Sequence, residues 1–265
     1  MSTVGLCTTV FGNRPPGPQD WASISSHGFT EIELALAPRR QDAADRAALA
    51  ALKETAAGAG VHLAALSVAL SDAESGIGSA NELGCKLLVV RAGPCRLHPA
   101  DPRESRSPGS SDPGAMRRIV EPLSAIAESR GVSLAIEFPS SWPAQEAVRL
   151  LEALDAPPVG VCLDLGHAHL KEGAPEAIEQ LAGYVQTIHV NDNLGRSDDH
   201  RLPFAGAIEW PAVLMELEKT GYTGPLVLEL AGEPDAATAI ARAVGARTRL
   251  QAILDDLAQP MVFPE

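Results

Sequence analysis

The stretch VGVCLDL, residues 159–165, carries the pattern that decides the fold. Side chains of a β-strand alternate between its two sides. One side of this stretch is therefore bulky and aliphatic, whereas the other carries Gly160, Cys162 and Asp164. Bulky side chains suit a layer that faces helices, and small ones suit the crowded axis of a barrel. We expect Asp164 to point inward at the C-terminal end of its strand.

Similar short apolar runs occur eight times along the chain, with helical patterns between them. The predicted strands are 4–10, 30–36, 62–68, 86–92, 133–138, 159–165, 185–190 and 225–230, and the clearest predicted helices are 42–60, 114–131, 143–154, 175–184, 210–222 and 235–258. Strands that alternate with helices pair in parallel, and eight repeats predict a closed (β/α)8 TIM barrel that forms one α/β domain over residues 1–265. A doubly wound open sheet is the alternative, but no G-x-G-x-x-G loop follows an early strand.

One connection stands out in this pattern. Residues 93–114 are rich in Pro, Ser, Gly and charge, so they are predicted to form a loop. A barrel places the loop on the C-terminal face, where active sites lie. It is either a tolerated surface insertion or a lid over the site. We expect substrate specificity to come from this loop and from the βα loops at 11–20 and 67–78.

Charge and composition argue against several classes of protein. The chain has 21 Lys and Arg against 34 Asp and Glu, and the net charge of −13 argues against general nucleic-acid binding. No run approaches the length of an apolar membrane span, and the N-terminus does not resemble a signal peptide. The four cysteines form no C-x-x-C pair and no zinc-finger spacing. We expect a cytoplasmic protein with reduced cysteines.

The alternation test places one ionisable side chain inward at the end of each of the last four strands. These residues are Glu137 in SLAIEF, Asp164 in VGVCLDL, His189 in VQTIHV and Glu229 in PLVLEL. Three carboxylates in a barrel mouth repel one another, and isolated buried charges are costly. A divalent cation resolves the repulsion, and the oxygen-rich ligand set favours Mn²⁺, Mg²⁺ or Co²⁺, with Zn²⁺ as a further candidate. The alternative is a buried polar network without a metal.

The same strand ends resemble those of a known family. The stretches LAIEF, CLDLGHA, TIHVND and LVLEL are similar to the sugar phosphate isomerase/epimerase family, within the xylose isomerase-like TIM barrel superfamily. The segment DDHRLPFAGAIEW (198–210) is similar to the family's acidic-His-Pro-Gly-Gly-Trp stretch, so the resemblance extends over essentially the whole chain. It implies one divalent metal ion bound by the four strand-end residues. It also implies a substrate contact from His167 and a catalytic acid/base role for Glu137 and Glu229.

The resemblance implies a reaction that begins with loss of a carbon-bound proton. The metal polarises a carbonyl and stabilises the enediolate that forms when a glutamate removes the proton. Return of the proton gives an isomerase or an epimerase of a small sugar, sugar phosphate or hydroxy-keto acid. A metal-dependent dehydratase or lyase is the main alternative. An AP-endonuclease-like zinc hydrolase and a non-catalytic binding barrel are the others. Barrels of this kind often form homodimers, although no stretch of the sequence marks an interface.

A second group of residues bears on the metal count. Asp198-x-His200, together with His167, resembles the additional zinc ligands of the AP-endonuclease branch. That branch uses three zinc ions and takes further His ligands from the ends of strands three and four. Here those strands end in LSVALS and VVRAGP, which contain no His. We therefore do not expect the full three-zinc site, and His200 serves the loop structure, the substrate or a second metal.

Four more charged residues are candidate substrate contacts. Glu33 faces inward near the end of the second strand, where it lines the pocket or forms a buried ion pair. Arg91 ends the fourth strand and binds either a substrate carboxylate or phosphate, or Glu33. Arg196 and Arg201 lie in the loop after His189, where they either bind an anion or face solvent.

Overall fold

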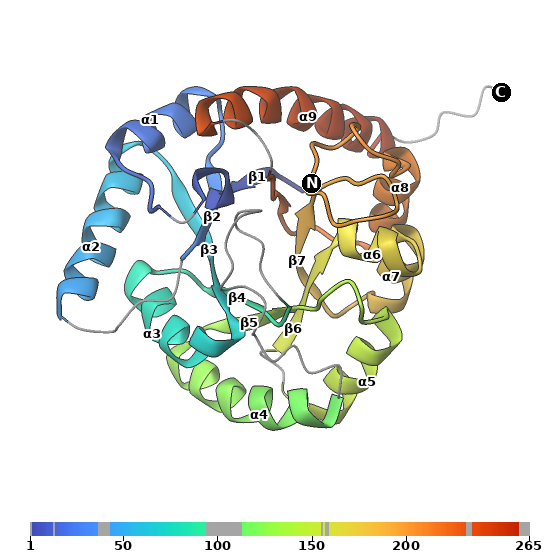
Figure 1. Cartoon of the computed structure of the whole chain (residues 1–265), viewed down its shortest axis with the longest axis horizontal. Coiled ribbons are helices and arrows are strands. Elements are labelled where there is room, and N and C mark those ends of the chain that lie inside the picture. Colours follow the sequence, from blue (N-terminus) through green and yellow to red (C-terminus); the bar gives the residue numbers. More distant parts are fainter. Residues whose placement is uncertain are drawn as a thin grey trace.

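The computed structural model describes residues 2–12, 14–36, 43–93, 113–154, 156, 159–231 and 235–259. Eight parallel strands form a closed barrel in sequence order, and β8 pairs with β1 to complete it (Figure 1). The strands are β1 (Val4–Cys7), β2 (Glu31–Ala35), β3 (His62–Ala69), β4 (Leu87–Arg91), β5 (Ser133–Glu137), β6 (Val159–Asp164), β7 (Val185–Val190) and β8 (Leu226–Leu228). The prediction of a (β/α)8 barrel is confirmed, and the open doubly wound sheet is excluded.

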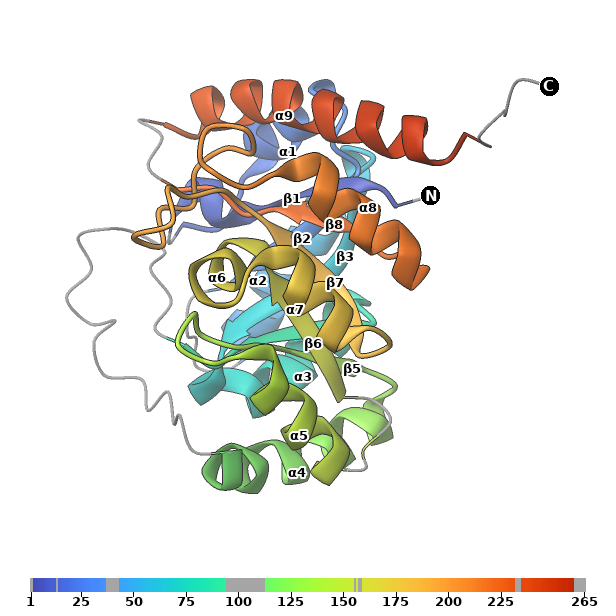
Figure 2. The same cartoon turned by 90° about the vertical axis from the view of Figure 1, so that its right-hand side faces the viewer.

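Helices surround the barrel, as Figures 1 and 2 show from two directions. They are α1 (Pro18–Ser26), α2 (Ala43–Gly58), α3 (Ala73–Leu83), α4 (Pro113–Arg130), α5 (Ala144–Leu154), α6 (Leu165–Lys171), α7 (Ala174–Leu181), α8 (Trp210–Thr220) and α9 (Ala236–Leu257), with the 3-10 helices η1 (Thr8–Phe11) and η2 (Leu70–Asp72). Outward-facing strand residues such as Leu163 and Ile188 are buried in the main hydrophobic core. Inward-facing Ala65, Val89, Ala135 and Cys162 form a separate small cluster. This division follows the pattern predicted from VGVCLDL.

The register of the strands places their C-terminal ends at a common level. Arg91 at the end of β4 pairs with Glu137 on β5, and Asp164 on β6 pairs with His189 on β7. Strands of a parallel barrel all point in the same direction, so the side chains that end them meet at one mouth. Inward-facing ionisable groups that are far apart in the sequence therefore lie close together.

Several segments differ from the predicted elements, among them 11–20, an expected loop in which α1 begins at Pro18. β1 ends at Cys7, because Thr8–Phe11 form η1 rather than continuing the strand to residue 10. Residues 67–78, expected to be a loop, contain the end of β3 and the start of α3. The sequence of this helix, AESGIGSANEL, is rich in Gly and Ser, which are weak helix formers. Gly76 allows a close approach, because a Cβ there would lie 2.9 Å from Val68 Cγ2 on β3.

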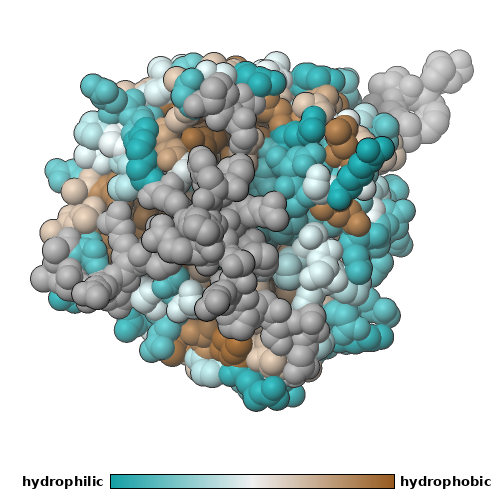
Figure 3. All heavy atoms as spheres, in the orientation of Figure 1, coloured by the Kyte–Doolittle hydropathy of each residue, from teal (hydrophilic) through white to brown (hydrophobic). Residues whose placement is uncertain are grey.

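The remaining sequence predictions concern the long loop, the cysteines, the surface and membrane-spanning helices. The predicted loop or lid at 93–114 lies largely outside the described residues, and so does Cys95. Cys7, Cys85 and Cys162 are buried free cysteines. Hydrophilic residues occupy much of the outer rim in Figure 3, with smaller hydrophobic patches between them. Within the described part of the chain, no helix combines the length and the hydropathy that crossing a bilayer requires.

Candidate metal centre

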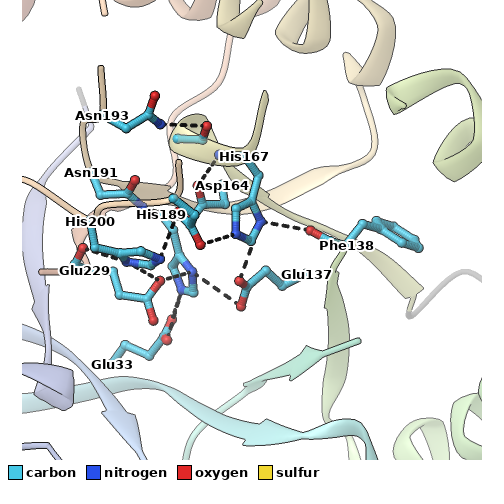
Figure 4. Close-up of polar contacts among 12 residues, drawn as sticks. Glu33, Glu137, Phe138, Asp164, His167, His189, Asn191, Asn193, His200 and Glu229 are labelled. Atoms are coloured by element: carbon cyan, nitrogen blue, oxygen red, sulfur yellow. Dashed lines mark hydrogen bonds and ion pairs between the residues drawn. The ribbon is translucent and has the colours of Figure 1, made fainter. Parts of the chain in front are cut away.

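Four ionisable residues meet at the C-terminal mouth of the barrel, at the ends of β5, β6 and β7 and directly after β8. They are Glu137, Asp164, His189 and Glu229, and all four are buried. One ligand atom from each lies within 4.8 Å of those of the other three. Figure 4 shows His189 between the two glutamates. The structure thus brings together the four residues predicted to bind a divalent metal.

Atoms that face one another in this cluster lack hydrogen-bond partners among the described residues. They are Glu137 Oε2, His189 Nδ1 and Glu229 Oε2, and each is buried. The His189 Nδ1 atom lies 3.0 Å from Glu229 Oε2 and 3.6 Å from Glu137 Oε2. Buried polar atoms are normally hydrogen-bonded, so several that converge without such a bond fit a site that binds a cation. Three carboxylates and an imidazole nitrogen fit a divalent cation.

The electrostatics of the cluster also favour a cation. Burial, together with the carboxylate of Glu229, raises the pKa of Glu137 to about 7. Burial alone would raise the pKa of Glu229 too, but His189 lowers it below its ordinary value. Burial lowers the pKa of His189, but Cys162, Glu229 and Glu33 together raise it well above its usual range. A bound cation would relieve the repulsion between carboxylates that raises the pKa of Glu137.

Asp164 is held through both of its carboxylate oxygens. The backbone N–H of His167, at the start of α6, donates to Oδ1 at 2.7 Å, and the side-chain amide of Asn191 donates to Oδ2 at 2.8 Å. These bonds fix the orientation of the carboxylate, as the outer partners of metal ligands commonly do. Sequence reasoning missed Asn191. Its signal is a polar residue directly after a buried strand, in HVND.

We expect Gly166→Ala to weaken metal binding. A Cβ at this position would lie 1.9 Å from Asn191 Oδ1 and 3.1 Å from Asp164 Oδ1, so both side chains would have to move. Overpacking typically costs about 1–3 kcal/mol, and loss of an outer partner lowers metal affinity about 10- to 100-fold. Competition with a chromophoric chelator measures the affinity. The control is Gly245→Ala, because a Cβ there meets nothing within 4 Å. A metal affinity of Gly166→Ala equal to that of the wild type would show that the positions of Asn191 and Asp164 do not depend on a glycine here.

Two further histidines share one carboxylate beside this four-residue cluster. His167 Nδ1 lies 3.0 Å from the carbonyl oxygen of Phe138, and its Nε2 lies 3.2 Å from Asp198 Oδ2. His200 Nε2 lies 3.3 Å from Asp198 Oδ1. Burial lowers the pKa of His200, but Asp198 raises it to about 10. Ligand atoms of Asp164, His167 and His200 also lie within 4.8 Å of one another, which is compatible with the second metal considered for His200.

The loop between β7 and α8 is organised by the buried carboxylate of Asp192. Its donors are the backbone N–H groups of Asn193 (2.9 Å), Phe204 (3.0 Å) and Ile208 (3.2 Å) and the indole N–H of Trp210 (3.0 Å). His200 (φ 46°) and Phe204 (φ 71°) adopt left-handed backbone conformations, which cost energy for residues other than glycine. Asp192 therefore stabilises a strained loop that places His200 at the site. Sequence reasoning missed this residue as well.

A cavity of about 310 Å³ opens beside the four-residue cluster. Its described lining consists of Thr9, Arg91, Gly93, Glu137, Pro139, Ser140, His167, Ser197, Asp198, His200, Glu229, Leu230 and Ala231. Arg91 is buried at the end of β4. Three of the predicted substrate contacts, His167, His200 and Arg91, therefore lie at one cavity, whose volume suits a small molecule.

The other three predicted substrate contacts lie elsewhere. Arg196 and Arg201 are exposed, and Arg201 pairs with the aspartate two positions before it, so these side chains face solvent. Neither is among the described residues that line the cavity. The side chain of Glu33 is 0% exposed, and its oxygens lie 3.0 and 3.1 Å from His189 Nε2. Glu33 thus forms the buried pair considered from the sequence, with His189 as its partner.

Comparison with known proteins agrees with this architecture. The uncharacterized protein y4fM of Sinorhizobium fredii (strain NBRC 101917 / NGR234) is 32% identical over 117 residues, which span 42% of this chain and only 38% of that protein. A structure of L-ribulose 3-epimerase has a TM-score of 0.75 and 18% identity, over 97% of this chain and 96% of that one. A crystal structure of the IOLI protein with a bound zinc atom has a TM-score of 0.71 and 18% identity, over 97% of this chain and 100% of that one.

These two solved structures, at 18% identity, show a shared fold. The family evidence is separate, because the profile described as xylose isomerase-like TIM barrel matches residues 21–250. This match begins in α1 and ends in α9, and so includes every strand from β2 to β8. The chain therefore belongs to the xylose isomerase-like TIM barrel family.

Proposed function

We propose that the protein is a divalent-metal-dependent isomerase or epimerase of a small sugar, sugar phosphate or hydroxy-keto acid. The observation that carries the proposal is the convergence of Glu137, Asp164, His189 and Glu229 beside a cavity of about 310 Å³. Membership of the xylose isomerase-like family and the likeness to an epimerase structure support it. The carboxylate-rich set favours Mn²⁺, Mg²⁺ or Co²⁺, and Zn²⁺ also fits.

Two of the four ligands are suited to move protons. When bound, the cation supplies positive charge that polarises a carbonyl group and offsets negative charge on neighbouring oxygens. Glu137 and Glu229 flank His189 (Figure 4) and both line the cavity. One carboxylate removes the carbon-bound proton, and the same carboxylate or its partner returns it. Return to the adjacent carbon gives isomerisation, whereas return to the opposite face gives epimerisation.

Three cavity residues supply N–H donors to the substrate. His167 and His200 lie beside the carboxylate cluster and share Asp198 as an acceptor. Their N–H groups donate to substrate oxygens on which negative charge develops when these oxygens replace Asp198 as the acceptor. Arg91 carries a fixed positive charge, which suits a phosphate or carboxylate group of the substrate. Because Arg91 is buried at the end of β4, its reach is limited to a group that enters the cavity.

Hydrogen exchange with solvent tests the proposal. Metal-reconstituted protein is incubated in D₂O with a panel of aldoses, ketoses, their phosphates and hydroxy-keto acids, and the products are read by NMR and mass spectrometry. We expect an isomer of one panel member, with deuterium on a carbon next to the carbonyl group. Chelator-treated protein is the control. A product that has lost water would identify a dehydratase instead, and the absence of exchange with every compound and metal would contradict the proposal.

A further inference from the structure

Glu33 is a buried carboxylate outside the four metal ligands and outside the described lining of the cavity. Its oxygens lie 3.0 and 3.1 Å from His189 Nε2. The thiol of Cys7 on β1 also donates to Oε1, at 3.6 Å. A buried carboxylate is costly unless a specific partner compensates for its burial. The contact with one nitrogen of a metal ligand is such a compensation.

The other nitrogen of the His189 ring faces the metal ligands. Nδ1 lies 3.0 Å from Glu229 Oε2 and 3.6 Å from Glu137 Oε2, and Figure 4 shows Glu33 across the ring from them. An imidazole that binds a cation through Nδ1 carries its one proton on Nε2, because the lone pair of Nδ1 is then used for the bond. Glu33 lies beside Nε2 and is placed to accept that N–H, whereas Nδ1 faces the carboxylate cluster.

The negative charge of Glu33 has a second effect. A carboxylate that accepts the N–H of a metal-bound imidazole makes the opposite nitrogen a stronger ligand. A neutral acceptor, such as a backbone carbonyl, would orient the ring equally well. The presence of a costly buried carboxylate in its place indicates that the charge itself contributes to metal binding.

We propose that Glu33 is a positioning residue, which turns Nδ1 of His189 toward the cation and strengthens that bond without touching the substrate. This inference rests on the proposed metal site and deepens it, because it adds a carboxylate from β2 to ligands that come from β5 to β8. It also replaces the substrate contact that the sequence predicted for Glu33.

Metal affinity of the metal-free protein tests this role. Glu33→Gln preserves the size of the side chain but removes its charge, and we expect affinity for Zn²⁺ and Mn²⁺ to fall about 10- to 100-fold in a competition assay with a chromophoric chelator. Circular dichroism checks that the variant is folded. Glu33→Asp, whose carboxylate is withdrawn from Nε2, replaces it if Glu33→Gln does not fold, and the same fall is expected. Affinity within twofold of wild type in the folded variant would overturn the inference.

The same strand supplies a matched control. Glu31 also pairs with a histidine, since its Oε2 lies 2.8 Å from His62 Nδ1, but this pair is partly exposed and lies at the N-terminal ends of β2 and β3. Glu31→Gln removes a comparable carboxylate–histidine contact without approaching the metal ligands. We expect its metal affinity to equal that of the wild type, and a fall as large as that of Glu33→Gln would overturn the specific role of Glu33.

A spectroscopic measurement separates positioning from a purely structural contact. In zinc-loaded wild-type protein with ¹⁵N-labelled histidine, we expect the proton of His189 on Nε2 and no proton on Nδ1. A proton on Nδ1 would overturn the inference. Wild-type protein that binds no metal would overturn the proposed function together with it, whereas tight metal binding that is unaffected in Glu33→Gln would overturn this inference alone.

Discussion

Glu229→Gln is expected to lower kcat by about 10²- to 10⁴-fold, the contribution typical of a positioned general acid or base. Glutamine has nearly the same volume as glutamate, but it cannot accept the proton and binds a cation less strongly. Glu229 lines the cavity, and its Oε2 lies 3.0 Å from His189 Nδ1. The change therefore affects both the proton transfer and the metal ligand set.

Two measurements on one sample separate these effects. Turnover is assayed at saturating metal, and bound metal is counted in the same preparation. Glu209→Gln is the control, because Glu209 is exposed at the start of α8 and its turnover should equal that of the wild type. A Glu229→Gln protein that retains its metal and turns over within tenfold of wild type would contradict the acid/base role.

Asp192→Ala is expected to lower the free energy of unfolding by about 3–5 kcal/mol. Asp192 is fully buried and accepts three backbone N–H groups and the indole N–H of Trp210. Its removal leaves several buried donors unpaired, and each unsatisfied group costs about 1–3 kcal/mol. Urea unfolding measures the loss. Asp192→Asn keeps one acceptor oxygen, so its free energy of unfolding should fall by less than that of Asp192→Ala.

The same loop provides the comparison for this stability prediction. Asp199 pairs with Arg201, at 3.1 Å, on the outside of the loop. A surface pair of this kind contributes less than about 1 kcal/mol, so the free energy of unfolding of Asp199→Ala should be close to that of the wild type. A loss below 1 kcal/mol in Asp192→Ala would show that the loop does not depend on this carboxylate.

The sequence predicted the barrel and the convergence of four ionisable strand-end residues because both follow from local periodicity. Alternation along VGVCLDL separates bulky from small residues, and the same rule applied to three more strands points Glu137, His189 and Glu229 inward. Parallel pairing then brings the strand ends together, as the register of Asp164 with His189 shows. The alternation of side chains along a strand does not depend on the loops, so the prediction holds even where the loop sequences carry no structural signal.

The unpredicted parts of the site depend on contacts between segments that no local pattern encodes. The partner of Glu33 lies 156 positions away on β7. The sequence could therefore predict that the Glu33 side chain points inward, but not which residue it contacts. The donors of Asp192 come from three points of an irregular loop and from Trp210 at the start of α8, and that loop turns Arg196 and Arg201 outward. The helix α3 was missed because Gly76 serves packing against β3 at the expense of helix propensity.

Metal content is the most direct test of the central claim that the barrel mouth binds one divalent cation. Protein purified without a chelator or a metal-affinity tag is analysed by elemental mass spectrometry beside Glu137→Gln and His189→Ala. We expect about one Mn, Co, Mg or Zn ion per wild-type chain and a large loss in both variants. Two or three zinc ions per chain would contradict a single-metal site, and a wild-type protein that holds no metal and takes up none on addition would contradict the metal centre itself.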